Sequence, residues 1–299
     1  MAVISAADWY ERRHVRVLDS HMAYVESGIG NPIVFLHGNP TSSHLWRNVI
    51  PRIGGPARCL APDLIGMGRS GKPEIAYRFA DHARYLDAWF DALELDGVIL
   101  VGCDWGGALA FDWAARHPER VRGLAFFETI LKPLSWDEYP PVAQARFKAF
   151  RTLGEGERLV LEENVFITQA LDATTLSELD DADRAVYAAP FPTPDSRRPF
   201  LAFSREAPIG GDPADMVTRV EAYDAWLASS ADVPKLLLTF DSSPTLMIGP
   251  ELTAWCEANI ASLDVVACGP AGHLAQEDQP EAIAAAIAEW AAVLTDAVR

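Results

Sequence analysis

Residues 98–110 read VILVGCDWGGALA, an apolar run followed by a tight turn between glycines and then by a helix-forming run. This is the pattern of a nucleophile elbow, a strained strand-to-helix turn that lifts its central side chain above a β-sheet. Glycines on either side keep neighbouring Cβ atoms from colliding. Asp104 holds the central position, where the common form of the motif has serine. The elbow therefore predicts an α/β enzyme with a carboxylate nucleophile.

An aspartate at this position changes the chemistry, because a carboxylate attacks without first losing a proton to a base. The predicted electrophile is an sp³ carbon, and attack on it leaves an alkyl ester on Asp104. Water must then hydrolyse that ester, which requires a base and a site for the oxyanion. The helix that begins near Trp105 supplies amide donors and a positive dipole end. The simpler alternative is an aspartate that only caps this helix.

The composition bounds the class of protein. The chain has 299 residues, 49% of them hydrophobic, which suffices for one large α/β domain and excludes a disordered or fibrous protein. Its formal charge of −17 argues against nucleic acid or an anionic membrane as a partner. The same charge favours a neutral substrate.

Several sequence features favour a cytoplasmic protein without cofactors. Residues 1–8 lack the basic and apolar regions of a signal peptide, and no later apolar run has the length of a transmembrane helix. The scattered cysteines form no C-x-x-C pair and indicate free thiols in a reducing compartment. No metal is implied, since the chain contains neither H-E-x-x-H nor a Cys/His ligand cluster.

Apolar runs and helical patterns alternate along most of the chain. Strands are expected at 15–18, 22–25, 33–36, 59–62, 98–101, 121–127, 235–240 and 263–268, the first two of them antiparallel. Helices are expected at 82–95, 104–117, 250–260 and 280–294. This alternation predicts right-handed βαβ crossovers and a parallel sheet.

Residues 132–211 interrupt the alternation with helical pieces that carry Pro, Trp and Phe. An insertion after the carboxyl end of a strand covers the crevice in which α/β sheets bind ligands. We expect a helical cap here, over a core domain made of residues 1–131 and 212–299. By excluding water, such a cap strengthens electrostatic interactions beneath it. The alternative is a surface elaboration with no role in the site.

Residues able to assist Asp104 follow other predicted strands. Asn39 lies in the turn after the third strand, where a second oxyanion donor is expected. His273, in the run GPAGH after the last strand, is the best candidate for the base. Either Glu128 or Asp241 could orient it, because each ends an apolar strand. Only one acid is required, and position along the chain leaves that choice open.

Together these motifs resemble the haloalkane dehalogenases of the α/β-hydrolase superfamily. The resemblance rests on Asn39, DWGG at 104–107, Glu128 and GPAGHLAQED at 269–278, and it extends over nearly the whole chain. It implies an α/β-hydrolase fold with a mostly parallel eight-stranded sheet, flanking helices and a helical cap. In the most similar subfamily the acid follows the sixth strand, which selects Glu128. The family's halide-binding residues match Asn39 and Trp105.

The resemblance also implies a pocket and a reaction. The apolar wall of the family's pocket is similar to Phe147, Phe150, Phe166, Pro208, Leu246 and Leu274. The implied reaction converts a small neutral halogenated alkane and water to a primary alcohol and a halide ion, without a cofactor. Family members usually carry histidine where this chain has Cys103. Because that position is not catalytic in the family, we expect altered packing or hydrogen bonding behind the elbow.

Three other functions share parts of this pattern. An epoxide hydrolase also attacks carbon with aspartate but needs phenolic acids from the cap, for which Tyr139, Tyr187 and Tyr223 are available. A coelenterazine luciferase related to the dehalogenases has a similar catalytic set. A binding protein on this scaffold, like the plant hormone receptors of the superfamily, is disfavoured by the intact nucleophile, base and acid. Asn39 and Trp105 fit a halide better than an epoxide.

Overall fold

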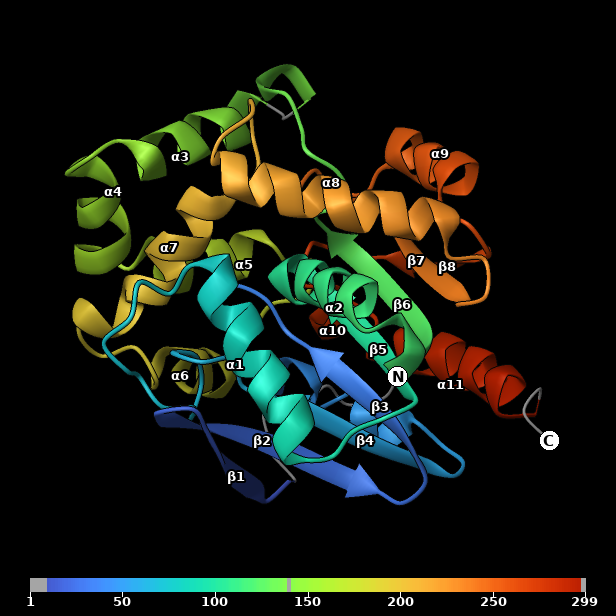
Figure 1. The fold of residues 1–299 in the computed structure, drawn as a ribbon. Coiled ribbons are helices and arrows are strands. Elements are labelled where there is room, and N and C mark those ends of the chain that lie inside the picture. Colours follow the sequence, from blue (N-terminus) through green and yellow to red (C-terminus); the bar gives the residue numbers. More distant parts are fainter. Residues whose placement is uncertain (1–9, 139–140, 297–299) are drawn as a thin grey trace.

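The computed structural model describes residues 10–138 and 141–296. A single eight-stranded sheet, in the order β1-β2-β4-β3-β5-β6-β7-β8, runs through it (Figure 1). The strands are β1 (Arg12–Val17), β2 (Ser20–Gly28), β3 (Asn31–Leu36), β4 (Ala57–Pro62), β5 (Val98–Cys103), β6 (Val121–Thr129), β7 (Lys235–Asp241) and β8 (Leu263–Pro270). β2 pairs antiparallel with both β1 and β4, and all other neighbours pair parallel. The predicted sheet is confirmed.

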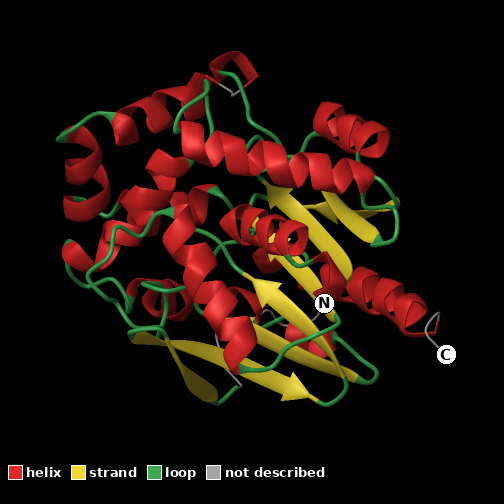
Figure 2. Cartoon of the chain, viewed as in Figure 1, coloured by secondary structure: helices red, strands yellow, loops and turns green. Residues whose placement is uncertain are grey.

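Helices cover both faces of this sheet (Figure 2). One face carries α1 (Phe79–Ala92), α2 (Asp104–Arg116) and α8 (Ala214–Ser229), and the other carries α11 (Pro280–Asp296). The remaining α-helices are α3 (Pro141–Arg151), α4 (Glu155–Glu157), α5 (Leu171–Ala173), α6 (Asp181–Ala188), α7 (Arg198–Glu206), α9 (Pro250–Asn259) and α10 (Ala275–Asp278). The four helices expected from sequence are present as α1, α2, α9 and α11.

The central strands β3, β5 and β6 are buried on both faces, which explains why they are almost continuously apolar. Val34 and Leu36 pack into a first core cluster with α1 and α2, whereas Ile33 and Phe35 pack into a second cluster with α11. Successive side chains of a strand point to opposite faces, so a central parallel strand needs apolar residues at every position. All four cysteines are free and buried.

The segment 132–211 leaves the sheet and returns to the same place. The N–H of Leu134 donates to the carbonyl of Pro208 at 3.1 Å, and the N–H of Gly210 donates to the carbonyl of Leu134 at 2.8 Å. Between these ends lie α3 to α7, which group together on the left in Figure 1, away from α9 and α11. Within its described residues, 132–138 and 141–211, this segment contributes no strand to the sheet.

Residues 10–138 and 141–296 include neither a helix able to cross a membrane nor a metal-binding group of side chains. No helix in that part of the chain is long and apolar enough to cross a membrane. No group of three or more His, Cys, Asp or Glu side chains there is arranged to hold a metal ion.

Candidate active site

The elbow between β5 and α2 has the geometry that its glycines predict. Asp104 adopts a left-handed backbone conformation with φ of 49°, which side chains rarely tolerate. A Cβ atom on Gly102 would lie 2.6 Å from the Cα of Gly107, and one on Gly106 would collide with the carbonyl oxygen of Leu36. Neither position can therefore carry a side chain without moving the backbone around it.

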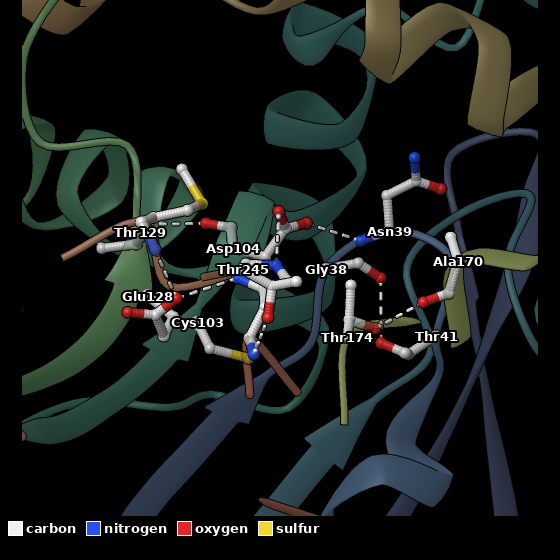
Figure 3. A network of polar contacts seen from close by, with 12 residues as sticks. Gly38, Asn39, Thr41, Cys103, Asp104, Glu128, Thr129, Ala170, Thr174 and Thr245 are labelled. Atoms are coloured by element: carbon white, nitrogen blue, oxygen red, sulfur yellow. Dashed lines mark hydrogen bonds and ion pairs between the residues drawn. The ribbon is translucent and has the colours of Figure 1, made fainter. Parts of the chain in front are cut away.

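The carboxylate of Asp104 is held from two sides. Its Oδ1 accepts the backbone N–H of Asn39 at 2.7 Å, and its Oδ2 lies 3.4 Å from Nε2 of His273 (Figure 3). The hydroxyl of Thr129 donates to the backbone carbonyl of Asp104 at 2.6 Å and ties the elbow to β6. The Asn39 N–H that binds the carboxylate is also placed to bind an oxyanion that develops there.

His273 lies between Asp104 and a second, buried carboxylate. Its Nδ1 is 3.1 Å from Oε2 of Glu128, a side chain that is only 1% exposed. The two oxygens of Glu128 also accept the backbone N–H groups of Met247, at 2.7 Å, and Ile248, at 3.1 Å. The carboxylate is thus fixed on several sides and directs one oxygen at the imidazole.

The other candidate acid lies elsewhere. Asp241 is exposed at the end of β7, and its carboxylate accepts the hydroxyl of the adjacent Ser242. The structure therefore brings Asp104, His273 and Glu128 together in one line of contacts. Asp241 is outside that line.

The two carboxylates control the protonation of the histidine. Burial lowers the pKa of His273, but hydrogen bonds and charge interactions with Asp104 and Glu128 outweigh it and raise the pKa to about 10. The two carboxylates therefore favour the protonated form of His273.

The indole of Trp105 is fixed by aromatic packing. It is 4% exposed and stacks on Phe203 of α7, with ring centroids 5.0 Å apart and an interplanar angle of 24°. Phe79, at the start of α1, lies 6.0 Å from it, centroid to centroid. The side chain of Asn39 carries a buried Oδ1 with no hydrogen-bond partner among the described residues.

The six predicted pocket residues divide into two groups. Phe147, Phe150 and Phe166 form a chain of ring contacts in the insertion, with centroid separations of 6.3 and 5.3 Å. Leu246 and Leu274 pack in the second core cluster, and Pro208 is buried at the end of the insertion. The structure thus brings the three phenylalanines together and places the leucines apart from them. The lining role of all six stays a prediction.

Two contacts near the site were not anticipated. The side-chain amide of Gln276 donates to Sγ of Cys103 at 2.8 Å, so the thiol does have a hydrogen-bond partner behind the elbow. Burial raises the pKa of the Cys103 thiol, which keeps it protonated and poorly nucleophilic. The hydroxyl of Thr245 accepts the backbone N–H of His273 at 3.3 Å (Figure 3). Neither Thr245, in a loop, nor Gln276, in α10, carries a sequence signal for its partner, which lies 28 residues away for Thr245 and 173 for Gln276.

The tyrosines expected for epoxide opening have other partners. The Tyr223 hydroxyl donates to the carbonyl of Ile130 at 2.6 Å, and the Tyr187 hydroxyl donates to Glu277. Both side chains are buried. Tyr139 lies outside the described residues.

Comparisons with known proteins identify the fold and the family of this chain. The family model of the α/β hydrolase fold matches residues 31–280. A haloalkane dehalogenase of Mesorhizobium japonicum is 50% identical over 283 residues, which cover 94% of this chain and 91% of that protein. Another, of Bradyrhizobium diazoefficiens, is 46% identical, with 97% and 96% covered. The crystal structure of a haloalkane dehalogenase from Bradyrhizobium elkani matches with a TM-score of 0.92 at 44% identity, covering 96% of this chain and 99% of that one. The chain belongs to the haloalkane dehalogenase family, within the α/β-hydrolase fold.

Proposed function

We propose that the chain hydrolyses the carbon–halogen bond of small neutral haloalkanes in two steps, both of which use Asp104. The observation that carries this proposal is the contact line from the elbow carboxylate through His273 to Glu128, with separations of 3.4 and 3.1 Å. No proton has to leave Asp104 before it attacks, so the first step needs no base.

In the first step an oxygen of Asp104 attacks the carbon that bears the halogen, and the bonding pair leaves with the halide. The products are an alkyl ester and a halide ion. Asn39 and Trp105 would hold that ion, because neutral N–H donors grip a diffuse anion without a full positive charge. The aromatic packing of Trp105 against Phe203 and Phe79 supports this role, since it fixes the indole beside the nucleophile.

In the second step His273 takes a proton from water while the water oxygen attacks the carbonyl carbon of the ester. The oxyanion that forms would be bound by backbone N–H groups at Asn39 and at the start of α2. Collapse of this intermediate breaks the bond to the alkoxide, which takes a proton from His273 and leaves as the alcohol. Glu128 stabilises the imidazolium during the step. Collapse leaves a carboxylic acid on Asp104, and its proton passes to the now neutral His273, 3.4 Å away, which restores the carboxylate.

We also propose that residues 132–211 form the cap over this site, on a core of residues 1–131 and 212–299. The paired ends of the insertion at Leu134 and Pro208 support this division, and so does the contact between Phe203 of α7 and Trp105. The free, buried cysteines fit a reducing compartment, and we propose the cytoplasm.

Two variants test the two-step scheme. With 1-bromobutane or 1,2-dibromoethane, Asp104→Ala should release no halide. His273→Phe should release up to one halide per enzyme and then stall as the ester, which intact-protein mass spectrometry detects. An unmodified His273→Phe protein after consumption of a substrate would contradict the scheme. A wild-type enzyme that opened epoxides and ignored every bromoalkane would instead identify an epoxide hydrolase.

A further inference from the structure

A carboxylate beyond the triad ties the catalytic histidine segment to the insertion. Asp278, at the end of α10, accepts the N–H of Gly272 on Oδ2 at 2.8 Å and the N–H of Ser177 on Oδ1 at 2.6 Å. The N–H of Leu176 lies within 3.1 Å of both oxygens. Gly272 directly precedes His273, whereas Leu176 and Ser177 belong to the insertion. We refer to Asp278 with these three N–H groups as the Asp278 clamp.

The backbone on the other side of His273 is joined to the same part of the insertion. The N–H of Leu274 donates to the carbonyl of Thr174 at 2.9 Å. A Cβ atom on Gly272 would collide with that same carbonyl oxygen, so the backbone at Gly272 is already in close contact with the backbone at Thr174. Both neighbours of His273 are therefore fixed against residues 174–177.

A buried network of ion pairs lies next to the Asp278 clamp and also connects the His273 segment to the insertion. Arg47 donates to both oxygens of Glu277 at 2.7 and 2.8 Å and to Asp183 of α6 at 2.6 Å. The hydroxyl of Tyr187, also in α6, donates to Glu277. Since all four side chains are buried, the segment after His273 is anchored to the insertion by a second set of contacts.

We propose that Asp278 is a positioning residue for His273, and that it supports ester hydrolysis without taking part in cleavage of the carbon–halogen bond. This inference rests on the two-step function proposed above. The first step depends on Asp104, whose Oδ1 is held by Asn39 and whose backbone carbonyl is held by Thr129, neither of which belongs to the clamp. Its Oδ2 lies 3.4 Å from His273, but a carboxylate attacks carbon without help from a base. The second step depends on where His273 places its Nε2 against water. A displacement of about 1 Å in a catalytic group can cost about 10²-fold in rate.

Asparagine at position 278 tests the clamp with a minimal change in shape. The carboxylate offers two acceptor oxygens, one toward Gly272 and one toward Ser177, whereas an amide has one oxygen and one NH₂ group. In the variant, the NH₂ group must therefore point at one of these backbone N–H groups. Two donors cannot form a hydrogen bond with each other. Either the insertion or the backbone beside His273 loses its hydrogen bond.

The experiment compares Asp278→Asn with Glu281→Gln. Glu281 lies three residues further along, is 61% exposed and pairs with Arg52 at 3.7 Å, so its variant removes a nearby charge without touching the clamp. Rapid-quench reactions with 1-bromobutane measure bromide release in the first turnover, and intact-protein mass spectrometry follows the alkyl ester. Circular dichroism of each variant reports whether it is folded.

For Asp278→Asn we expect the release of one bromide per folded enzyme at the wild-type rate. The alkyl ester should then accumulate, because its hydrolysis is about 10- to 100-fold slower than in the wild type. Glu281→Gln should match the wild type. Equal slowing of both steps, or wild-type hydrolysis, would overturn the proposal. If Asp278→Asn does not fold, Gly272→Ala decides in the same way, because its Cβ pushes the same backbone away from Thr174. A wild-type enzyme that released no bromide would refute the proposed function instead.

Discussion

The first chemical step removes one of the two negative charges that surround His273, and this change should convert the residue from an acid to a base. Asp104→Asn reproduces the neutral charge of the ester with nearly the same atoms. The Oδ2 of Asp104 is 3.4 Å from Nε2 of His273. At an effective dielectric constant of about 20, two unit charges at that distance interact by about 5 kcal/mol. Since one pKa unit corresponds to about 1.4 kcal/mol, this charge accounts for a pKa difference of about 3 to 4.

The sign follows from the charge of the imidazolium. A negative neighbour stabilises the protonated ring, so removing it lowers the pKa of His273. In the resting enzyme the two carboxylates outweigh burial and raise that pKa to about 10. We therefore expect a much lower pKa of His273 in Asp104→Asn and in the alkyl-enzyme, which favours the neutral imidazole that a general base requires. Hydrolysis of the accumulated ester should accelerate as the pH rises through this lower value.

Nuclear magnetic resonance of labelled histidine measures the pKa of His273 directly, both in the wild type and in Asp104→Asn. The spectrum of His273→Phe identifies the relevant signal by its absence, and intact mass shows that the amide of Asp104→Asn persists during the titration. Asp241→Asn is the control, because that exposed carboxylate lies outside the triad contacts and its loss should leave the titration unchanged. A His273 signal with the same midpoint in the wild type and in Asp104→Asn would refute the reasoning.

Two further predictions concern the acid and the halide site. Glu128→Gln should slow ester hydrolysis by about 10⁴, as expected when a triad acid loses its charge, while Asp241→Asn stays near wild type in the same mass-spectrometric assay. The reverse ranking would assign the acid to Asp241. Trp105→Phe and Asn39→Ala should each slow the first-turnover release of bromide by about 10² to 10³, the usual cost of losing one preorganised donor. Saturable quenching of intrinsic fluorescence by bromide should also weaken in Trp105→Phe, and wild-type rates in both variants would contradict the halide assignment.

Local sequence patterns predict the buried strands well and the exposed elements less well. The strand expected at 33–36 is β3, Asn31–Leu36, because a strand buried on both faces is apolar throughout. The first strand was expected at 15–18 but spans Arg12–Val17, since half of its residues are exposed and four of the six are polar. No element was expected at α8, although it buries a set of side chains at helical spacing, Met216, Val220, Tyr223 and Leu227.

The candidate site was predictable where it depends on strand ends and not where it depends on contacts between loops. The carboxyl ends of parallel strands meet at one edge of a sheet, so motifs after β3, β5, β6 and β8 were expected to converge. Strand ends alone left both Glu128 and Asp241 open, and the family resemblance selected Glu128. The sheet order gives the physical reason, because β6 lies beside β5 and β7 lies one strand further away. The bond from Gln276 to Cys103 and the Asp278 clamp join residues distant in sequence, and no local pattern encodes them.

The nucleophile and the base are anchored to different parts of the molecule, and this separation has a consequence for how the insertion acts. Asp104 is held by the turn after β3 and by β6, within the sheet. His273 is held by Glu128 at its ring and by residues 174–177 through the backbone on either side. If the two steps proceed as proposed, movement of residues 174–177 disturbs the base before it disturbs the nucleophile. Substitutions in residues 174–177 should therefore lengthen the lifetime of the ester while bond cleavage keeps its rate.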